Sequence, residues 1–135
     1  MTDTLDQLDE LAQRALSIGD IQSAAIFMAA PGSTMLRLVA AAGIQGPPLD
    51  ALVAAVRNPD HPVARALTDG GPTFDVQPVA PGGPKLRSHL PLVPESDPGH
   101  EAVGVLAVAH DAPLDEQERR DLLDLARAAA GAISS

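Results

Sequence analysis

The stretch Ala102-Val103-Gly104-Val105-Leu106-Ala107-Val108-Ala109 contains no polar side chain. Successive side chains of a β-strand point to opposite faces of its sheet. Both faces of this stretch are apolar, with Val103, Val105 and Ala107 on one and Ala102, Leu106 and Val108 on the other. A strand of that kind is covered on both sides. We therefore expect residues 102–109 to form a central strand, with helices packed on both faces of the sheet.

Turn and capping signals divide the rest of the chain into eight further elements. Thr4 and Gln7 fit a capping box at a helix start, and Asp115 with Glu118 fits an N-cap and its third helical position. Pro47-Pro48 opens another helix, because proline is tolerated in a first turn. The predicted elements are a helix between Thr4 and Gly19, strands at 22–30 and 34–41, a helix from Pro47 to the break at Asn58-Pro59, a short helix at 62–68, strands at 73–76 and 86–93, the central strand, and a helix from Asp115 to about Ile133.

The composition excludes several classes of function. The 135 residues fit a single domain over residues 1–135. The chain has no cysteine, so it has no disulfide, thiolate metal site or thiol nucleophile. Its net charge of −9 and its scarcity of aromatic residues, only Phe27 and Phe74, disfavour nucleic acids and anionic membranes as partners. The acidic start Met-Thr-Asp-Thr is unlike a signal peptide, and no apolar run is long enough to span a membrane. We expect a cytoplasmic protein.

Several motifs, in this order along the chain, resemble those of the GAF domain, a relative of PAS sensory domains. They are His61-Pro62-Val63-Ala64-Arg65-Ala66-Leu67 before Gly70-Gly71-Pro72, Ser88-His89-Leu90-Pro91-Leu92, the stretch 101–108 with its Val-Gly-Val-Leu step, and Asp115-Glu116-Gln117-Glu118 followed by Asp121-Leu122-Leu123. The resemblance covers about Leu5 to Ile133. It implies an α+β fold with a central antiparallel five-stranded sheet, helices on both faces and the order α-β-β-α-α-β-β-β-α. GAF domains are typically sensory modules that bind small molecules in a pocket over one face of the sheet, and many pair through their terminal helices.

The departures from that family remove its named activities. The Asn-Lys-Phe-Asp-Glu signature of cyclic-nucleotide GAF domains is absent, and the missing cysteine removes both the bilin anchor and the free-methionine-sulfoxide reductase chemistry. The roadblock fold is an alternative, since it also combines a five-stranded sheet with flanking helices. It normally has one helix between the second and third strands, whereas the break at Asn58-Pro59 favours two.

Five residues are candidate ligand contacts, and we expect a pocket between the sheet and residues 49–84. A pocket is mostly apolar with a few placed polar groups, and a basic strand residue inside it would contact an acidic small molecule. The alternative is that the basic residues lie on the solvent side of an edge strand and the aromatic residues belong to the core. The candidates are Phe27, Arg37, Phe74, Arg87 and His89.

No catalytic site is predicted. Ser88, His89 and Asp75 have the residue types of a hydrolytic triad. Ser88 and His89 are neighbours in one strand, however, and their side chains point to opposite faces. We therefore reject this triad and predict no enzymatic activity.

No metal or other cofactor is predicted either. The four histidines, at positions 61, 89, 100 and 110, include no pair with the i, i+4 spacing of a helical zinc site. Each is interpreted as a surface or capping residue. Asp97, His100 and Glu101 are close in sequence, and we interpret them as part of a solvated hairpin turn.

The terminal helices have wider apolar faces than packing on a sheet requires. In the closing helix, one stripe suffices to cover the sheet, and further apolar residues extend to one side of it. We predict that this surplus forms a homodimer, since contiguous apolar patches mark interaction sites. The alternative is that the two helices pack against each other and bury all of this surplus apolar surface. The predicted interface residues are Leu11, Ile18, Leu123, Ala126 and Ala130.

The sequence thus predicts a stand-alone GAF-like sensory or regulatory domain. It would bind a small molecule over the sheet and signal through a homodimer or another partner. The alternative is a protein-interaction or dimerisation module with no small-molecule ligand.

Overall fold

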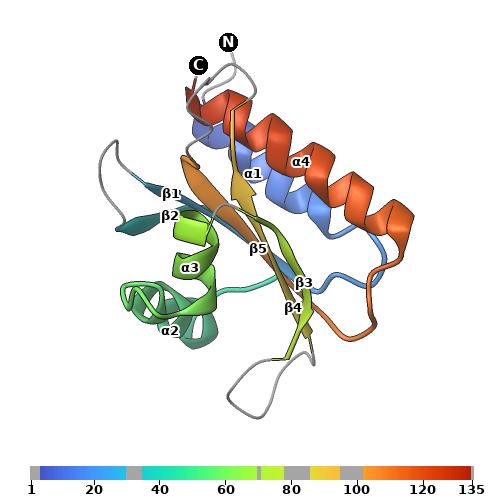
Figure 1. The fold of residues 1–135 in the computed structure, drawn as a ribbon, viewed down its shortest axis with the longest axis horizontal. Helices are drawn as coiled ribbons and strands as arrows, with labels where there is room; N and C mark the ends of the chain where they lie inside the picture. The colour runs from blue at the N-terminus through green and yellow to red at the C-terminus, as the bar shows by residue number, and fades with distance from the viewer. Residues whose placement is uncertain (1–3, 30–34, 70, 78–85, 95–101, 135) are drawn as a thin grey trace.

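A computed structural model describes residues 4–29, 35–69, 71–77, 86–94 and 102–134. Its five strands form one antiparallel sheet in the order β2-β1-β5-β4-β3 (Figure 1). The elements are α1 (Thr4–Ala15), β1 (Ser23–Ala29), β2 (Leu36–Ala42), α2 (Pro47–Ala55), α3 (Pro62–Asp69), β3 (Thr73–Val76), β4 (Leu86–Leu92), β5 (Gly104–His110) and α4 (Glu116–Ser134). The predicted fold class and the order of the elements are confirmed.

The strand β5 lies at the centre of the sheet and is paired along both edges. Leu106 lies opposite Ile26 of β1 on one side and Leu90 of β4 on the other. Val105, Leu106 and these two neighbours are all at least 98% buried. The prediction of a doubly covered central strand is therefore confirmed.

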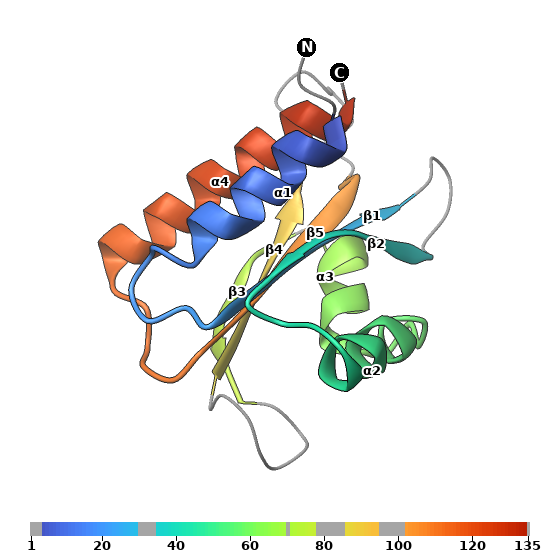
Figure 2. The same cartoon turned by 180° about the vertical axis from the view of Figure 1, so that it is seen from behind.

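Two helices cover each face of the sheet. Figures 1 and 2 show α1 and α4 side by side on one face and α2 with α3 on the other. The α1/α4 side has the larger core, in which Leu8, Leu122 and Ile26 are almost fully buried. The α2/α3 side has a smaller core around Phe27 and Val63.

The N-cap that the sequence predicts for the last helix is present, and it forms part of a capping box. The Asp115 carboxylate accepts the Glu118 backbone N–H at 2.7 Å, and Glu118 accepts the Asp115 N–H at 2.9 Å. Each side chain thereby satisfies a backbone donor that the helix itself leaves free. This reciprocal pair fixes where α4 begins.

Some predicted boundaries shift. The first helix ends at Ala15 instead of running to Gly19. Residues 16–18 continue as turns, in which each backbone N–H donates to the carbonyl three residues earlier. The central strand begins at Gly104 instead of 102, although Val103 still donates to the Leu92 carbonyl at 2.7 Å. The predicted turn at 31–33 and the loop residues 78–84 and 95–100 lie outside the described residues. Among the residues that the structure describes, no helix is both long and apolar enough to cross a membrane.

The close approach of β5 to β1 requires a residue without a side chain at Gly104. A Cβ atom there would lie 2.1 Å from the Phe27 carbonyl oxygen. We expect Gly104→Ala to lower the free energy of unfolding by about 3 kcal/mol, because two central strands must move apart. Urea unfolding followed by circular dichroism measures the change.

Gly131→Ala is the matched control. A Cβ at Gly131 meets no atom within 4 Å, and the residue lies in α4. Alanine is about 1 kcal/mol better than glycine inside a helix, so this variant should be slightly more stable than the natural protein. If both variants have the same stability, the close approach at Gly104 does not constrain the sheet.

Candidate functional site

The strand β4 presents different chemistry on its two faces. Ser88, Leu90 and Leu92 point toward α1 and α4, and Leu90 and Leu92 belong to the larger core. Since side chains alternate along a strand, Arg87 and His89 point toward α2 and α3. His61, just before α3, interacts electrostatically with His89. We call His61, Arg87 and His89 the basic cluster.

His89 is the buried member of the basic cluster, with 4% of its surface exposed. The pKa of its imidazole is lowered to about 4, mainly by burial, and the nearby His61 and Arg87 act in the same direction. Its Nδ1 lies 3.3 Å from the Thr73 hydroxyl of the edge strand β3. His89 is therefore a neutral ring at neutral pH, in surroundings that oppose its protonation.

His61 caps the start of α3. Its Nδ1 accepts the backbone N–H of Val63 at 3.2 Å. In a neutral imidazole only one ring nitrogen carries a proton, so the proton of His61 is on Nε2, which is left as a donor. Partial burial lowers the pKa of His61 as well.

Arg87 supplies the permanent positive charge of the cluster. Desolvation lowers the pKa of its guanidinium, and Asp111 acts in the opposite direction. One guanidinium nitrogen donates to the Leu86 carbonyl at 3.2 Å. An arginine at neutral pH stays charged in such a setting, so the cluster combines one cation with two imidazole rings.

The opposite face of β4 carries a buried hydrogen-bond chain through Ser88 and His110. His110 Nδ1 lies 2.8 Å from the Ala112 carbonyl, which can only accept, so this nitrogen carries the proton. His110 Nε2 then accepts the Ser88 hydroxyl at 2.8 Å, and Ser88 Oγ accepts the Asp75 backbone N–H at 3.1 Å. Ser88 and His110 are both completely buried, so no substrate reaches this hydroxyl. The chain ties β3, β4 and β5 together.

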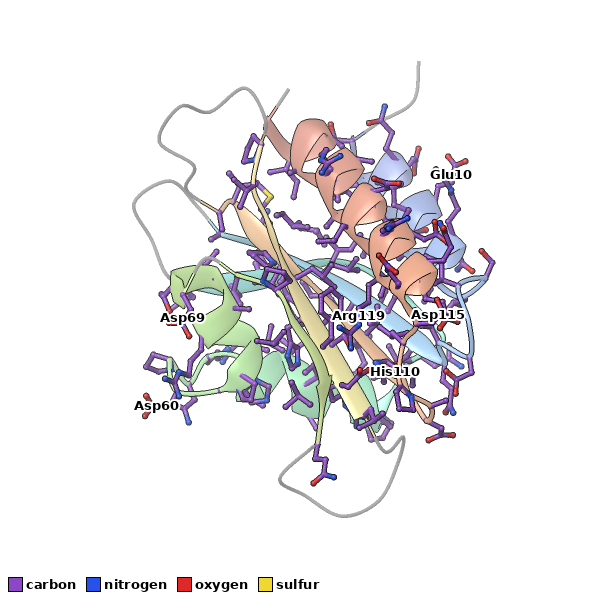
Figure 3. All side chains as sticks on the ribbon, turned by 45° about the vertical axis from the view of Figure 1, so that its right-hand side comes forward. Glu10, Asp60, Asp69, His110, Asp115 and Arg119 are labelled. Carbon is purple, nitrogen blue, oxygen red and sulfur yellow. The ribbon has the colours of Figure 1, made fainter. Side chains whose placement is uncertain are left out.

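Asp75 joins the edge strand β3 to the start of α4. Its φ of 57° lies in the left-handed region, which aspartate tolerates better than most residues. Its carboxylate accepts the Leu114 N–H at 3.0 Å and the Arg119 guanidinium at 2.7 Å. Arg119 also lies over the Phe74 ring, 4.9 Å from its centre. Figure 3 shows Arg119 and His110 at the same end of the sheet, near the start of α4.

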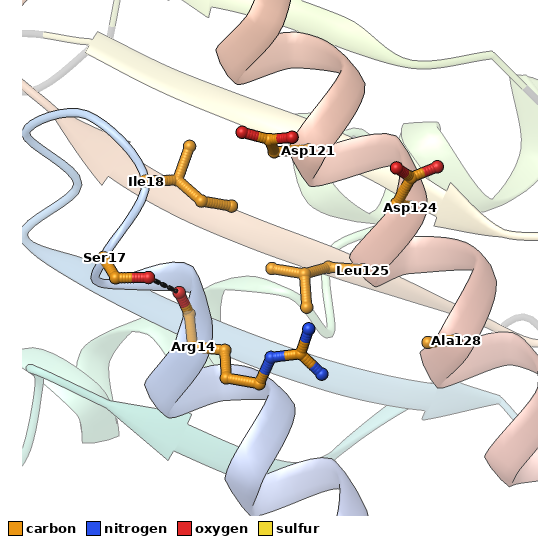
Figure 4. Close-up of a pocket in the computed structure, with 7 residues that line it drawn as sticks. All are labelled: Arg14, Ser17, Ile18, Asp121, Asp124, Leu125 and Ala128. Atoms are coloured by element: carbon orange, nitrogen blue, oxygen red, sulfur yellow. Dashed lines mark hydrogen bonds between the residues drawn. The ribbon is translucent and has the colours of Figure 1, made fainter.

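A groove of about 320 Å³ lies between α1 and α4. Figure 4 shows the Arg14 guanidinium extending from α1 toward α4, where Asp121 and Asp124 lie. The apolar residues that line the groove include Ile18 and Leu125, which are 8% and 6% exposed. The groove thus combines one cation and two carboxylates with apolar side chains.

Solved structures resemble this chain over nearly its full length. The GAF domain of a phosphoenolpyruvate-protein phosphotransferase from Coxiella burnetii matches with a TM-score of 0.76 and 13% identity, over 99% of this chain and 84% of that one. The second GAF domain of DevS from Mycobacterium smegmatis gives 0.73 and 20%, over 96% and 92%. The chain has the fold of a GAF domain.

One further protein of similar structure is an enzyme. The type II free methionine-R-sulfoxide reductase from Thermoplasma acidophilum matches this chain with a TM-score of 0.73 and 12% identity, over 97% of this chain and 92% of that one. No family model matches the sequence, and no curated protein is similar to it. At these identities the likeness establishes the fold.

The GAF fold brings some of the predicted ligand contacts together and separates others. Arg87 and His89 share the α2/α3 side of the sheet with Phe27, which is fully buried in the smaller core. Phe74 packs with the larger core on the opposite side, so the prediction that both aromatic residues line one pocket is wrong. Arg37 lies between Leu36 and Leu38, which pack on the α2/α3 side, and it is exposed on the other face.

His61 was not among the predicted contacts. It lies 28 positions before His89 in the sequence, and no local pattern connects the two. Its position directly before Pro62 does mark a helix start. That signal predicts that the His61 ring lies at the start of a helix, but it does not predict that the ring lies near β4.

The predicted dimer residues are mostly buried within the single chain. Ala126 and Ala130 are 4% and 0% exposed, so the prediction that they extend an open apolar surface is wrong. Leu11 and Ile18 are each 8% exposed, whereas Leu123 is 37% exposed. The mutual packing of α1 and α4, the alternative considered above, accounts for the two alanines.

Residues with metal-binding potential do not gather in the part of the chain that the structure describes. No group of three His, Cys, Asp or Glu side chains there could hold a metal ion. Asp97, His100 and Glu101 lie outside the described ranges. The triad that pairs Ser88 with His89 is rightly rejected. Their side chains lie on opposite faces of β4, and Ser88 forms its hydrogen bond with His110 instead.

The pKa of His89 has a consequence for stability. An unfolded histidine titrates near 6.5, whereas His89 in the fold titrates at about 4. Between these values the unfolded chain binds more protons, so the stabilisation from neutral His89 is complete above pH 6.5 and is lost as the pH falls toward 4. The loss amounts to about 3 kcal/mol. Urea unfolding of the natural protein and of His89→Gln at pH 4.5 and pH 7 tests this.

The comparison between the two proteins isolates His89 from the other titrating groups. The natural protein should lose more stability on acidification than His89→Gln does. An equal loss in both proteins would show that His89 does not titrate differently in the folded and unfolded states.

Proposed function

We propose that this chain is a sensory or regulatory GAF domain that binds a small molecule on the α2/α3 side of its sheet. The basic cluster carries the proposal. It places polar groups on a face that is otherwise built from apolar residues such as Phe27 and Val63. Ligand sites have this composition, mostly apolar with a few converging polar groups.

The chemistry of the chain supports binding over catalysis. The fold relative from Thermoplasma acidophilum is a reductase by name, but this chain has no cysteine to carry out thiol chemistry. The Ser88–His110 pair has the contact of a nucleophile with its base. Both residues are nevertheless completely buried, which supports a structural role.

The edge strand β3 supports a path from the ligand side to the terminal helices. Thr73 contacts His89 on the α2/α3 side, and two residues later Asp75 bonds Arg119 of α4. A ligand that moves His89 would act on β3 and thereby on the start of α4. A sensor requires this type of connection, in which one element makes different contacts in two states.

We expect a binding ligand to raise the stability of the folded state. At a concentration one hundred times its Kd, a ligand adds about 2.7 kcal/mol. Thermal unfolding in the presence of a panel of charged and uncharged metabolites should identify at least one stabilising compound. His89→Gln should weaken the response to that compound, and Arg37→Gln, which removes an exposed arginine from the other face, should leave it unchanged.

Two results would contradict this function. One is that no compound in a broad panel stabilises the natural protein. The other is that Arg37→Gln weakens the response as much as His89→Gln does.

A second candidate function is dimerisation through α1 and α4, and the groove between these helices favours it. Arg14, Asp121 and Asp124 carry opposite charges on one surface. A two-fold dimer presents the same patch twice, so each arginine can face a carboxylate of the other copy. The partly exposed Leu123 and the exposed Leu5 on the same two helices add apolar surface.

We expect a dimer that depends on these charges. Arg14→Glu and Asp124→Arg should each give a folded monomer, because each variant places like charges across the two-fold axis. The double variant should dimerise again. Size exclusion with light scattering measures the mass, and circular dichroism verifies the fold.

Three further results bear on the interface. Leu123→Glu should also leave a folded monomer, whereas Ala130→Glu should unfold the domain because Ala130 is completely buried. A monomeric natural protein at high micromolar concentration would exclude the dimer.

A further inference from the structure

We propose that the groove between α1 and α4 binds a free α-amino acid with an aliphatic side chain. Arg14 would hold the carboxylate of the amino acid, and Asp121 with Asp124 would hold its ammonium group. The groove is separate from the site proposed on the α2/α3 side, because α1 and α4 cover the opposite face of the sheet (Figures 1 and 2). The inference therefore goes beyond the proposed function and does not depend on it.

Arg14 supplies a cation that the protein itself leaves unpaired. It lies in the last turn of α1, and its guanidinium extends across the groove toward α4 (Figure 4). Among the described residues, no carboxylate lies within 4.0 Å of this guanidinium and no group forms a hydrogen bond with it. Ser17 donates to the Arg14 carbonyl at 2.7 Å, a contact with the backbone alone. The N–H groups of the guanidinium are therefore available to a carboxylate, whose two oxygens match their geometry.

Asp121 and Asp124 supply the opposite charge from the facing wall of the groove. They are three positions apart on α4, so their side chains are neighbours on one side of the helix. Asp121 Oδ1 accepts the Gln117 side chain at 2.9 Å, and Asp124 Oδ1 lies 3.6 Å from Arg127. The contact with Gln117 leaves Oδ2 of Asp121 able to accept from a ligand. An ammonium group, with three N–H donors, can bond this oxygen and the Asp124 carboxylate together.

The charges on the two walls favour a ligand that carries both signs. Arg127 partly neutralises Asp124 on its own helix, so Arg14 and Asp121 remain as one cation and one anion across the groove. An anion would be attracted by the guanidinium and repelled by the carboxylates, and a cation would experience the reverse. An α-amino acid has a carboxylate and an ammonium group on the same carbon. It can therefore fill the gap between the walls and complement both of them.

The apolar lining favours an aliphatic side chain on this amino acid. Ile18 and Leu125 are largely buried and lie beneath the charged groups. Ala128 also lines the groove, is exposed and carries only a methyl group, so it leaves space beside Leu125. The groove volume of about 320 Å³ is at the lower end of the range for small-molecule sites. That size suits an amino acid better than a larger metabolite.

The exposure of the charged side chains predicts weak, salt-dependent binding. Arg14 and Asp124 are exposed, and Asp121 is half-buried. Ion pairs at such positions contribute little and are screened by salt. We expect a Kd for the amino acid of about 1 mM at low ionic strength, and a higher Kd when sodium chloride is added.

L-leucine is the probe, and its binding is followed through the amide signals of the ¹⁵N-labelled protein by NMR. We expect leucine to shift the signals of groove residues such as Ser17 and Ala128 more than those of α2 and α3. Isocaproate lacks the ammonium group of leucine, isopentylamine lacks its carboxylate, and glycine lacks its aliphatic side chain. Each analogue should bind more weakly than leucine, by about fivefold for the loss of one exposed ion pair.

Variants test which residues hold the amino acid. Arg14→Gln and Asp121→Asn should each raise the Kd for leucine about fivefold. Ala128→Leu should abolish the shifts, because the larger side chain fills the groove. Arg120→Gln is the matched control, since Arg120 is an exposed arginine of α4 that pairs with Glu116 outside the groove lining. Circular dichroism verifies that each variant is folded.

A second copy of the chain docked through Arg14 would compete with the amino acid, because both would use the same charges. The titration is therefore repeated with Leu123→Glu, which we expect to be a folded monomer. Leu123 does not line the groove, so this variant keeps the proposed site intact. It should bind leucine at least as tightly as the natural protein does.

The proposal is overturned if leucine shifts no groove signal in either the natural protein or Leu123→Glu. It is also overturned if isocaproate or isopentylamine binds as tightly as leucine, or if Arg14→Gln and Arg120→Gln have the same Kd. His89→Gln should leave leucine binding unchanged, so a failure at the groove is distinguishable from a failure of the site on the α2/α3 side. Loss of leucine binding in His89→Gln but not in Arg14→Gln would place the amino acid on that other side and overturn the inference.

Discussion

The burial of β5 on both faces and its pairing on both edges are the constraint on which the other elements depend. β1 can approach this strand closely because Gly104 leaves room for the Phe27 carbonyl, and β4 pairs with its other edge. Helices must then cover both faces, because an apolar strand surface exposed to water is unfavourable. The two cores on the α1/α4 and α2/α3 sides follow from that requirement.

The edge strand β3 connects these two sides through a local change of backbone conformation. The left-handed φ of Asp75 coincides with a register irregularity between Thr73 and Val76. As a result, Thr73 reaches His89 on one face, whereas the Asp75 carboxylate reaches Arg119 and Leu114 on the other. A strand of four residues thereby contacts both the candidate ligand site and the start of α4.

Small side chains have different consequences on the two sides of the sheet. On the α1/α4 side, Ala126 and Ala130 let the helices pack closely, and their apolar surface is used within the monomer. On the α2/α3 side, Ala107 and Ala109 lie opposite His89 and Arg87 of β4. The same residue type therefore lies between two helices on one side of the sheet and beside the polar residues of β4 on the other.

The sequence by itself determined the order of the elements, the central position of β5, the cap of α4 and the separation of Ser88 from His89. These features depend on local periodicity and on spacings of a few residues, which the chain fixes before it folds. The sequence also placed Arg87 and His89 on one face of β4. Only the tertiary structure decided that His61 joins them, that Ser88 meets His110, and that Phe27 and Phe74 lie in different cores. These contacts depend on strand register and on the left-handed residue at Asp75, and both are set by pairing between segments that are distant in the sequence.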